Sequence, residues 1–218
     1  MSESHQLIHQ DSGQVEWYTP APIIEAARAT MGGIDLDPAS SAAANETVRA
    51  GRFFTEADNG LAQLWRGRVW LNPPFSDNAV FVRRVVADYK AGHIPQACVM
   101  TFASLDTQWA RWLAAFPRWY ATGRVAYVAG WEIPPARQLA LWEMGEAVVA
   151  ELPEKDGPPK ASMVTYLGAA VERFVAEFTG RLGGWVDVPW SWHERVVGEM
   201  TAASPGMNLY RKGDTDHE

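Results

Sequence analysis

Apolar positions follow two different periods along this chain. Short apolar runs rich in β-branched and aromatic residues are separated by segments in which apolar residues recur three and four positions apart. The first pattern is typical of buried strands and the second of amphipathic helices. We expect strands at 34–37, 68–71, 96–102 and 118–128, and helices at 20–30, 40–50, 77–91 and 108–116. This alternation predicts an α/β fold with a mostly parallel, doubly wound sheet.

The first predicted helix has recognisable start and stop signals. Thr19 is its expected N-cap, Pro20 suits the first helical position, and a Gly-Gly pair follows its last turn. The strand at 34–37 comes next and stops at Pro38. Ligands of open α/β sheets bind outside the carboxyl ends of the strands, and Asp37 is at such an end.

The strand at 68–71 stops at Asn72, which is followed by Pro73, Pro74 and Phe75. Each proline fixes φ near −65°, so Asn72 and Phe75 are held on a stiff turn. An amide, a constrained backbone carbonyl and a ring face can together grip a planar base that carries an amino group. The alternative is a Pro-Pro turn with a structural role only.

This loop resembles the Asn/Asp-Pro-Pro-Tyr/Phe catalytic loop of amino-group methyltransferases. Three stretches that precede it resemble the phage-type DNA N6-adenine methyltransferase (Dam) family, in the order of that family. They are Glu16–Pro20, Asp35–Ser40 with Asn45, and Phe53–Leu61, with weaker matches at Asp106–Trp109 and Gly123–Arg124. The resemblance covers about residues 16–128, with one more strand expected near 160–168. It implies a Rossmann-like sheet that uses S-adenosylmethionine to methylate the N6 amino group of adenine in DNA, in a protein encoded by a phage or prophage.

The resemblance also implies roles for individual residues. Asn72, Pro73, Pro74 and Phe75 would be catalytic. S-adenosylmethionine carries an ammonium, a carboxylate, a ribose diol and an adenine, so its site needs carboxylates and backbone amides. The expected cofactor-binding residues are Trp17, Thr19, Pro20, Asp35, Asp37, Pro38, Ala39, Ser40 and Asp58.

Among these residues, the carboxylates have different expected partners. Asp37 is the first choice for the amino group or the ribose hydroxyls and Asp35 the second, because strand alternation points both to one face. Backbone N–H groups near Ser40, at a helix start, could receive the methionyl carboxylate. Asp58 could accept from the adenine amino group. Ordinary capping and turn formation is the alternative for all three carboxylates. The usual glycine-rich loop of the wider superfamily is replaced by Asp37–Ser40, as in the narrower phage family.

Charge is unevenly distributed along the chain. The net charge of −7 argues against a nucleic-acid partner. Residues 61–130, however, hold eight Lys/Arg and three Asp/Glu, a balance of +5 around the Asn72–Phe75 loop. We expect Arg83, Arg84 and Arg124 to contact DNA phosphates. Solvated helix surfaces are the alternative explanation for these arginines.

Composition agrees with a single-domain enzyme of ordinary size. At 218 residues with 47% hydrophobic content, the chain can bury a core. Cys98 is the single cysteine and is expected to be a buried small hydrophobe in a reducing compartment. The five histidines lack metal-ligand spacing, so we expect no metal site. Neither a signal-peptide pattern nor an apolar run of membrane length is present, so we expect a cytoplasmic protein, in the host cytoplasm if phage encoded.

The same patterns divide the chain into segments. Residues 1–15 are expected to be flexible, and the methyltransferase domain is expected at 16–168, with a possible inserted element at 132–159. A helical, Trp-rich appendage is expected at 169–218, with a disordered acidic tail at its end. These patterns leave the oligomeric state undetermined.

Two further functional classes remain open at this point. The same fold and loop could act on cytosine N4, an RNA base or a protein glutamine, because each presents a conjugated NH₂ group. A non-catalytic DNA-binding or host-defence-inhibiting protein could also retain the fold. The intact Asn72–Phe75 loop argues against that class, and the acidic net charge argues for it.

Overall fold

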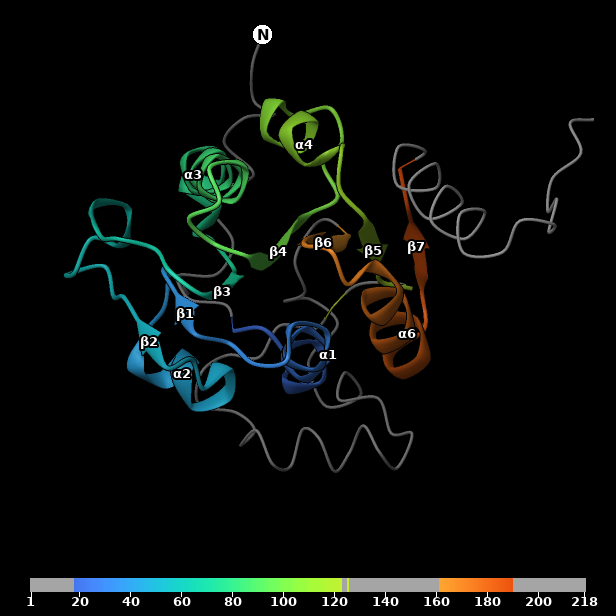
Figure 1. Cartoon of the computed structure of the whole chain (residues 1–218), viewed down its shortest axis with the longest axis horizontal. Helices are drawn as coiled ribbons and strands as arrows, with labels where there is room; N and C mark the ends of the chain where they lie inside the picture. The colour runs from blue at the N-terminus through green and yellow to red at the C-terminus, as the bar shows by residue number, and fades with distance from the viewer. Residues whose placement is uncertain (1–17, 123–124, 126–160, 190–218) are drawn as a thin grey trace, which may run out of the picture. The chain divides into compact units, whose positions relative to one another are not determined.

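The computed structural model describes residues 18–122, 125 and 161–189 (Figure 1). Its helices are α1 (Ala21–Met31), α2 (Ala42–Val48), α3 (Asn78–Lys90), α4 (Gln108–Leu113) and α6 (Val171–Leu182). Two short 3₁₀ turns, η1 (Gly60–Ala62) and η2 (Phe75–Asp77), precede β3 and α3 respectively. The strands are β1 (Leu36–Asp37), β2 (Arg52–Phe53), β3 (Arg68–Leu71), β4 (Gln96–Phe102), β5 (Arg118–Tyr120), β6 (Ser162–Leu167) and β7 (Trp185–Asp187).

The seven strands form one mixed sheet in the order β2-β1-β3-β4-β6-β5-β7. β2, β1, β3 and β4 run parallel to one another. β6 runs antiparallel to both β4 and β5, and β7 runs antiparallel to β5. The α/β class is therefore confirmed, whereas the expectation of a mostly parallel sheet is correct only for the β2–β4 half.

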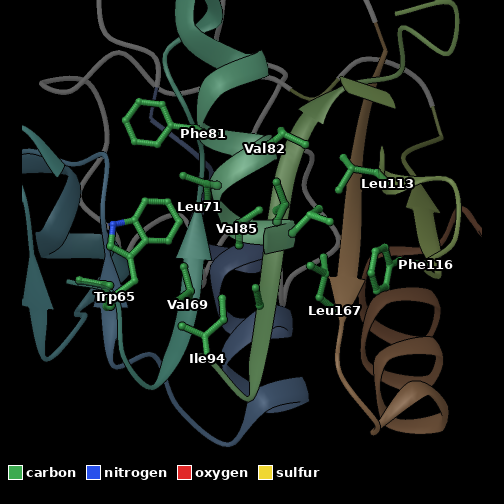
Figure 2. Packing of buried hydrophobic residues seen from close by; sticks show 14 of the residues in the cluster. Trp65, Val69, Leu71, Phe81, Val82, Val85, Ile94, Leu113, Phe116 and Leu167 are labelled. Atoms are coloured by element: carbon green, nitrogen blue, oxygen red, sulfur yellow. The ribbon is translucent and has the colours of Figure 1, made fainter. Parts of the chain in front are cut away.

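Helices cover both faces of this sheet. α3 and α4 lie over one face, and α1 and α6 lie over the other (Figure 1). The β3 and β4 side chains alternate between the two faces, as the pleat requires. Val69 and Leu71 of β3 belong to the same buried cluster as Val82 and Val85 of α3 (Figure 2). Burial of each such side chain contributes about 1.5–3 kcal/mol, so this layer holds β3 and β4 firmly in place.

The sheet continues past residue 168, where the sequence pattern placed the start of an appendage. One compact unit extends to Asp187, and β7 is its last strand. α6 buries Phe174 and Phe178. Trp119 of β5 donates its indole N–H to the Gly183 carbonyl at 2.8 Å. The predicted flexible segment at 1–15, the possible insertion at 132–159 and the acidic tail lie outside the described residues.

Local boundaries differ from the predicted ones in several places. Pro20, not Thr19, is the N-cap residue of α1, and no side chain caps this helix. The cap of α2 is Ser41, whose hydroxyl accepts from the Ala44 N–H. β1 starts at Leu36, α4 ends at Leu113 and β5 ends at Tyr120, so all three are shorter than predicted. β2 and β7 were not predicted, because runs of two or three residues carry too little periodicity.

Two expectations from composition can be compared with the described residues. Cys98 is fully buried in β4, as predicted for a small hydrophobe, and this burial raises the pKa of its thiol. Within residues 18–122 and 161–189, no helix combines the length and apolarity that a membrane span needs.

Candidate functional site

The candidate site lies where β1, β3 and β4 end. Leu36, Leu71 and Val99 all belong to the buried cluster that contains α3. Because side chains alternate along a strand, Asp37 and Phe102 are directed to the opposite face, which α1 covers, and Asn72 directly follows the end of β3. The parallel registers Leu36↔Val69 and Leu71↔Val99 bring these strand ends to one edge of the sheet. Two of the predicted site residues, Asp37 and Asn72, therefore lie at the same edge of the sheet.

The Asn72–Phe75 loop joins β3 to α3 through a tight turn. Asn72 is half-buried, Pro73 is buried and Pro74 is exposed. Pro74 has φ −53° and ψ 136°, and its carbonyl accepts from the Asp77 N–H at 3.0 Å. The 3₁₀ turn η2 follows and leads directly into α3. The stiff turn at a strand end that the two prolines predicted is present.

Phe75 stacks on a second aromatic ring that sequence reasoning did not single out. Its ring centroid lies 4.2 Å from that of Phe102, with an interplanar angle of 29°. Phe102 is half-buried at the end of β4, and Phe75 is 40% exposed. The signal for Phe102 was available, because the predicted strand 96–102 ends on this residue and next to the loop-bearing strand.

Asp37 is a buried carboxyl at the end of β1. It is only 3% exposed, and its Oδ1 accepts from the Ala39 N–H at 3.2 Å. Burial raises the pKa of Asp37 to about 7, although the hydrogen bond from the Ala39 N–H acts to lower it. A buried carboxyl of this kind favours a ligand that brings a positive charge or hydroxyl donors.

The loop after β1 is hydrogen-bonded to the segment at 53–60 and packs closely against it. The Ser40 N–H donates to the Phe54 carbonyl at 2.8 Å, and the Phe54 N–H donates to the Asp37 carbonyl at 2.9 Å. Gly60 packs so closely on Pro38 that a Cβ there would overlap the Pro38 carbonyl oxygen. Two of the family-like stretches thus form one structural unit. The Ala39 and Ser40 N–H groups are used inside this unit, so they do not provide the expected free amides for a carboxylate.

The N-terminal stretch reaches the same edge of the sheet. Tyr18 lies with its hydroxyl 3.2 Å from the Ser41 hydroxyl, at the start of α2. Thr19 is buried and donates its hydroxyl to the sulfur of Met100 in β4 at 3.6 Å. Pro20 is also buried. Tyr18 was not among the predicted site residues, and Trp17, which was, lies outside the described residues.

Comparison with known proteins identifies the family. The family model described as DNA N-6-adenine-methyltransferase (Dam) matches residues 8–136, more than half of the chain. The chain belongs to this family. It is also similar to a protein named DNA N-6-adenine-methyltransferase from Escherichia phage T1, with 30% identity over 155 residues. That alignment covers 68% of this chain and 60% of the phage protein, so the chain spans about three fifths of its relative's length. The resemblance read from the motifs is confirmed, and the matched range contains all the candidate residues.

Asp35 lies away from the carboxyl edge in this Dam-family chain. It sits before β1 and binds Arg68 at the start of β3, through Nη2 to Oδ1 at 2.7 Å and Nε to Oδ2 at 2.8 Å. The Arg68 backbone N–H also donates to Oδ2 at 2.8 Å. These hydrogen bonds, led by that of the guanidinium, lower the pKa of Asp35. Both carboxylate oxygens are engaged, so Asp35 joins the start of β3 to the segment before β1, and its expected cofactor role stays a prediction.

Asp58 is engaged within its own turn. Its Oδ2 accepts from the Thr55 N–H at 2.8 Å and from the Thr55 hydroxyl at 2.7 Å. These two bonds lower the pKa of the exposed Asp58 carboxyl. The geometry is that of a side chain closing a turn, which was the alternative explanation for this residue.

The predicted phosphate-binding arginines have different environments. Arg84 donates to Asp88 at 2.6 Å, to the Leu61 carbonyl at 2.8 Å and to the Gln63 carbonyl at 3.1 Å. Its guanidinium also lies 5.0 Å from the Trp65 ring centroid. Arg84 therefore anchors the loop before β3 through these internal contacts, and its expected phosphate contact stays a prediction. Arg83 is exposed on α3, and Arg124 lies outside the described residues.

Proposed function

We propose that this protein transfers a methyl group from S-adenosylmethionine to the exocyclic N6 amino group of adenine in DNA. The observation that supports this most directly is the common edge of the sheet at which Asn72, with its Pro-Pro turn, and the buried Asp37 lie. Family membership adds the expectation of an adenine in DNA as the substrate. A phage or prophage origin is part of the proposal and rests on the phage T1 relative.

The cofactor would be held mainly from the β1 side. Asp37 fits the ammonium or the ribose hydroxyls, because a buried carboxyl whose pKa is raised gains most from a cationic or donor-rich partner. Thr19 and Pro20 would close the pocket from the N-terminal stretch, next to Met100. Pro38 and Ala39 would form its wall. When bound, S-adenosylmethionine supplies an electrophilic methyl group on a sulfonium.

The base would be held by the loop after β3. The lone pair of an adenine amine is delocalised into the ring, which makes the amine a weak nucleophile. Asn72 Oδ1 and the Pro73 carbonyl would accept its two hydrogens, and this localises the lone pair toward the methyl carbon. The methyl group would pass from the bound cofactor to the amine nitrogen, the cofactor sulfur would keep the electron pair of the broken C–S bond, and the surplus amine proton would pass to water. Positioning and fixed dipoles supply most of the rate in this scheme.

Phe75 would stack on one face of the base. In duplex DNA the base must first leave the helical stack, at a cost of a few kcal/mol. A ring on a stiff turn offers a flat surface that recovers part of this cost. Arg83, on the exposed side of α3, is a candidate for phosphate contacts.

Mass spectrometry of nucleosides from cells that express the protein would test the proposal. DNA and RNA should be digested separately, with Asn72→Ala as the matched control. We expect N6-methyladenine to rise in DNA with the wild type and not with the variant. A rise in N4-methylcytosine or in a methylated RNA base would show that the same chemistry acts on another acceptor. The absence of any modified base would favour a protein glutamine as the acceptor or a non-catalytic binding protein.

A further inference from the structure

The aromatic pair Phe75 and Phe102 joins two neighbouring strand ends across the candidate site. The rings are nearly parallel, 29° apart, at a centroid distance of 4.2 Å. Such offset stacking contributes beyond simple burial and restricts how each ring can turn. Phe75 belongs to the catalytic loop, whereas Phe102 has no assigned part in it.

The two rings are not equally constrained. Phe102 is the last residue of β4, and its backbone is paired with Ser162 of β6 in the middle of the sheet. Phe75 begins a three-residue 3₁₀ turn between Pro74 and α3. Three-residue turns of this type have weaker hydrogen-bond geometry than strands or long helices. Phe102 is therefore the fixed partner, and the orientation of the Phe75 ring depends on it.

The spacing decides on which side of Phe75 a base can stack. A base inserted between two rings needs about 7 Å between them, twice an ordinary contact distance. At 4.2 Å the inner face of Phe75 is closed by Phe102. Phe75 is 40% exposed, so part of its ring outside the Phe102 contact remains accessible. We propose that Phe102 is a positioning residue, which holds the Phe75 ring from behind so that its outer face meets the target base.

This inference rests on the proposed function, because it takes Phe75 as the ring on which the base stacks. It predicts a loss of turnover when the supporting ring is removed. We expect Phe102→Ala to lower kcat about three- to tenfold, with a smaller change in KM for DNA. Phe102→Tyr keeps a flat ring and should stay near the wild type. Phe102→Leu keeps bulk without a ring face and should resemble Phe102→Ala.

A double-mutant cycle separates positioning from direct contact. Phe75→Ala, Phe102→Ala and the double variant would be assayed with radiolabelled S-adenosylmethionine and duplex DNA from cells that lack N6-methyladenine. If Phe102 acts through Phe75, its replacement should have no further effect in the Phe75→Ala background. An equal loss in both backgrounds would overturn the proposal.

The remaining outcomes distinguish this inference from the proposed function. If Phe75→Ala is impaired while Phe102→Ala has wild-type kcat, the positioning role is overturned and the methyltransferase proposal stands. If Phe75→Ala is itself unimpaired, base stacking on this loop is overturned, and the role of Phe102 with it.

A folding control keeps the result interpretable. Tyr89 and Phe116 form an edge contact, with centroids 5.6 Å apart, on the face covered by α3 and α4. Tyr89→Ala should lower the melting temperature and leave kcat unchanged. If Phe102→Ala fails to fold, the kcat of Phe102→Leu should be compared with that of Phe102→Tyr to test the positioning role. Equal kcat for these two variants would overturn the proposal, since only one of them keeps a ring.

Discussion

The side chain of Asp37 combines burial with an ionisable group, and this makes the stability of the ligand-free protein depend on pH. Burial raises the pKa of Asp37 to about 7, so between about pH 4 and pH 7 the folded state holds a proton that the unfolded state releases. The free energy of unfolding should therefore fall as pH rises through this window, and the loss should be complete above pH 7. Asp37→Asn should remove this slope and be more stable than the wild type at pH 8. Urea unfolding at pH 5 and pH 8 would measure both effects, and parallel pH profiles for the two proteins would contradict the prediction.

The same carboxyl should make cofactor affinity depend on pH in the opposite direction. If the ionised carboxylate accepts from S-adenosylmethionine, the dissociation constant should fall as pH rises from 5.5 to 7, by at most tenfold per unit. Above pH 7 it should level off. Calorimetric titrations in two buffers of different ionisation enthalpy would also count the proton released on binding. Asp37→Asn should bind S-adenosylmethionine weakly at every pH. Tight binding by this variant would show that Asp37 does not contact the cofactor.

Asn72 offers the most direct test of the chemistry. Asn72→Ala removes one acceptor from the target amine and should cost on the order of 3 kcal/mol in the transition state, about a hundredfold in rate. Cofactor affinity should change much less than turnover. Ser76→Ala is a matched control nearby, because Ser76 is exposed and its hydroxyl bonds Asp77. Near-native turnover in Asn72→Ala would remove the basis of the mechanism.

At the scale of elements, the contact between the loop after β1 and the segment at 53–60 should limit which residues fit at Gly60. A Cβ there would overlap the Pro38 carbonyl oxygen, and backbone cannot move aside as a flexible side chain does. We expect Gly60→Ala to cost about 1–3 kcal/mol of unfolding free energy and to weaken cofactor binding as well. Gly180→Ala is the control, because Gly180 lies in α6 with open space around it. That variant should be slightly stabilised, by about 1 kcal/mol. Thermal unfolding of both would show whether the two segments must remain in contact.

At the scale of the whole molecule, the acidic total charge is compatible with DNA binding only if a local surface is basic. Arg83 is exposed and Arg84 is bound internally, so neighbouring residues should behave differently. Arg83→Glu should weaken DNA binding and reduce the slope of log K against log salt by roughly 0.9 for each phosphate that the protein no longer neutralises. Arg84→Glu should instead lower the melting temperature. Glu172→Gln, on the exposed side of α6, should leave the slope unchanged. The slopes would be measured from the affinity for one duplex at several salt concentrations. An unchanged slope for Arg83→Glu would show that Arg83 does not contact phosphate.

Patterns along the chain were sufficient to predict β3 and β4 with their observed bounds, and the stiff Asn72–Phe75 turn between β3 and α3. The reason is that these features are local: a continuous apolar run is buried on both faces, and a Pro-Pro pair ends the strand whatever surrounds it. The family could also be read from the order of short motifs. Asp37 was placed correctly at a strand end for the same reason.

Contacts between distant residues were decided only by the tertiary structure. Asp35 and Asp37 look equivalent by alternation, yet Arg68, 33 positions from Asp35, binds one of them and burial changes the pKa of the other. Arg83 and Arg84 are adjacent in sequence, yet Arg84 is bound by Asp88 and by the loop carbonyls of Leu61 and Gln63, whereas Arg83 is exposed. The antiparallel β6 and the three-residue β7 depend on pairing partners, and the Phe75–Phe102 stack depends on which strands are neighbours. Side-chain type and local period determine what a segment can form, whereas charge pairing, burial and strand order arise only once the chain is folded.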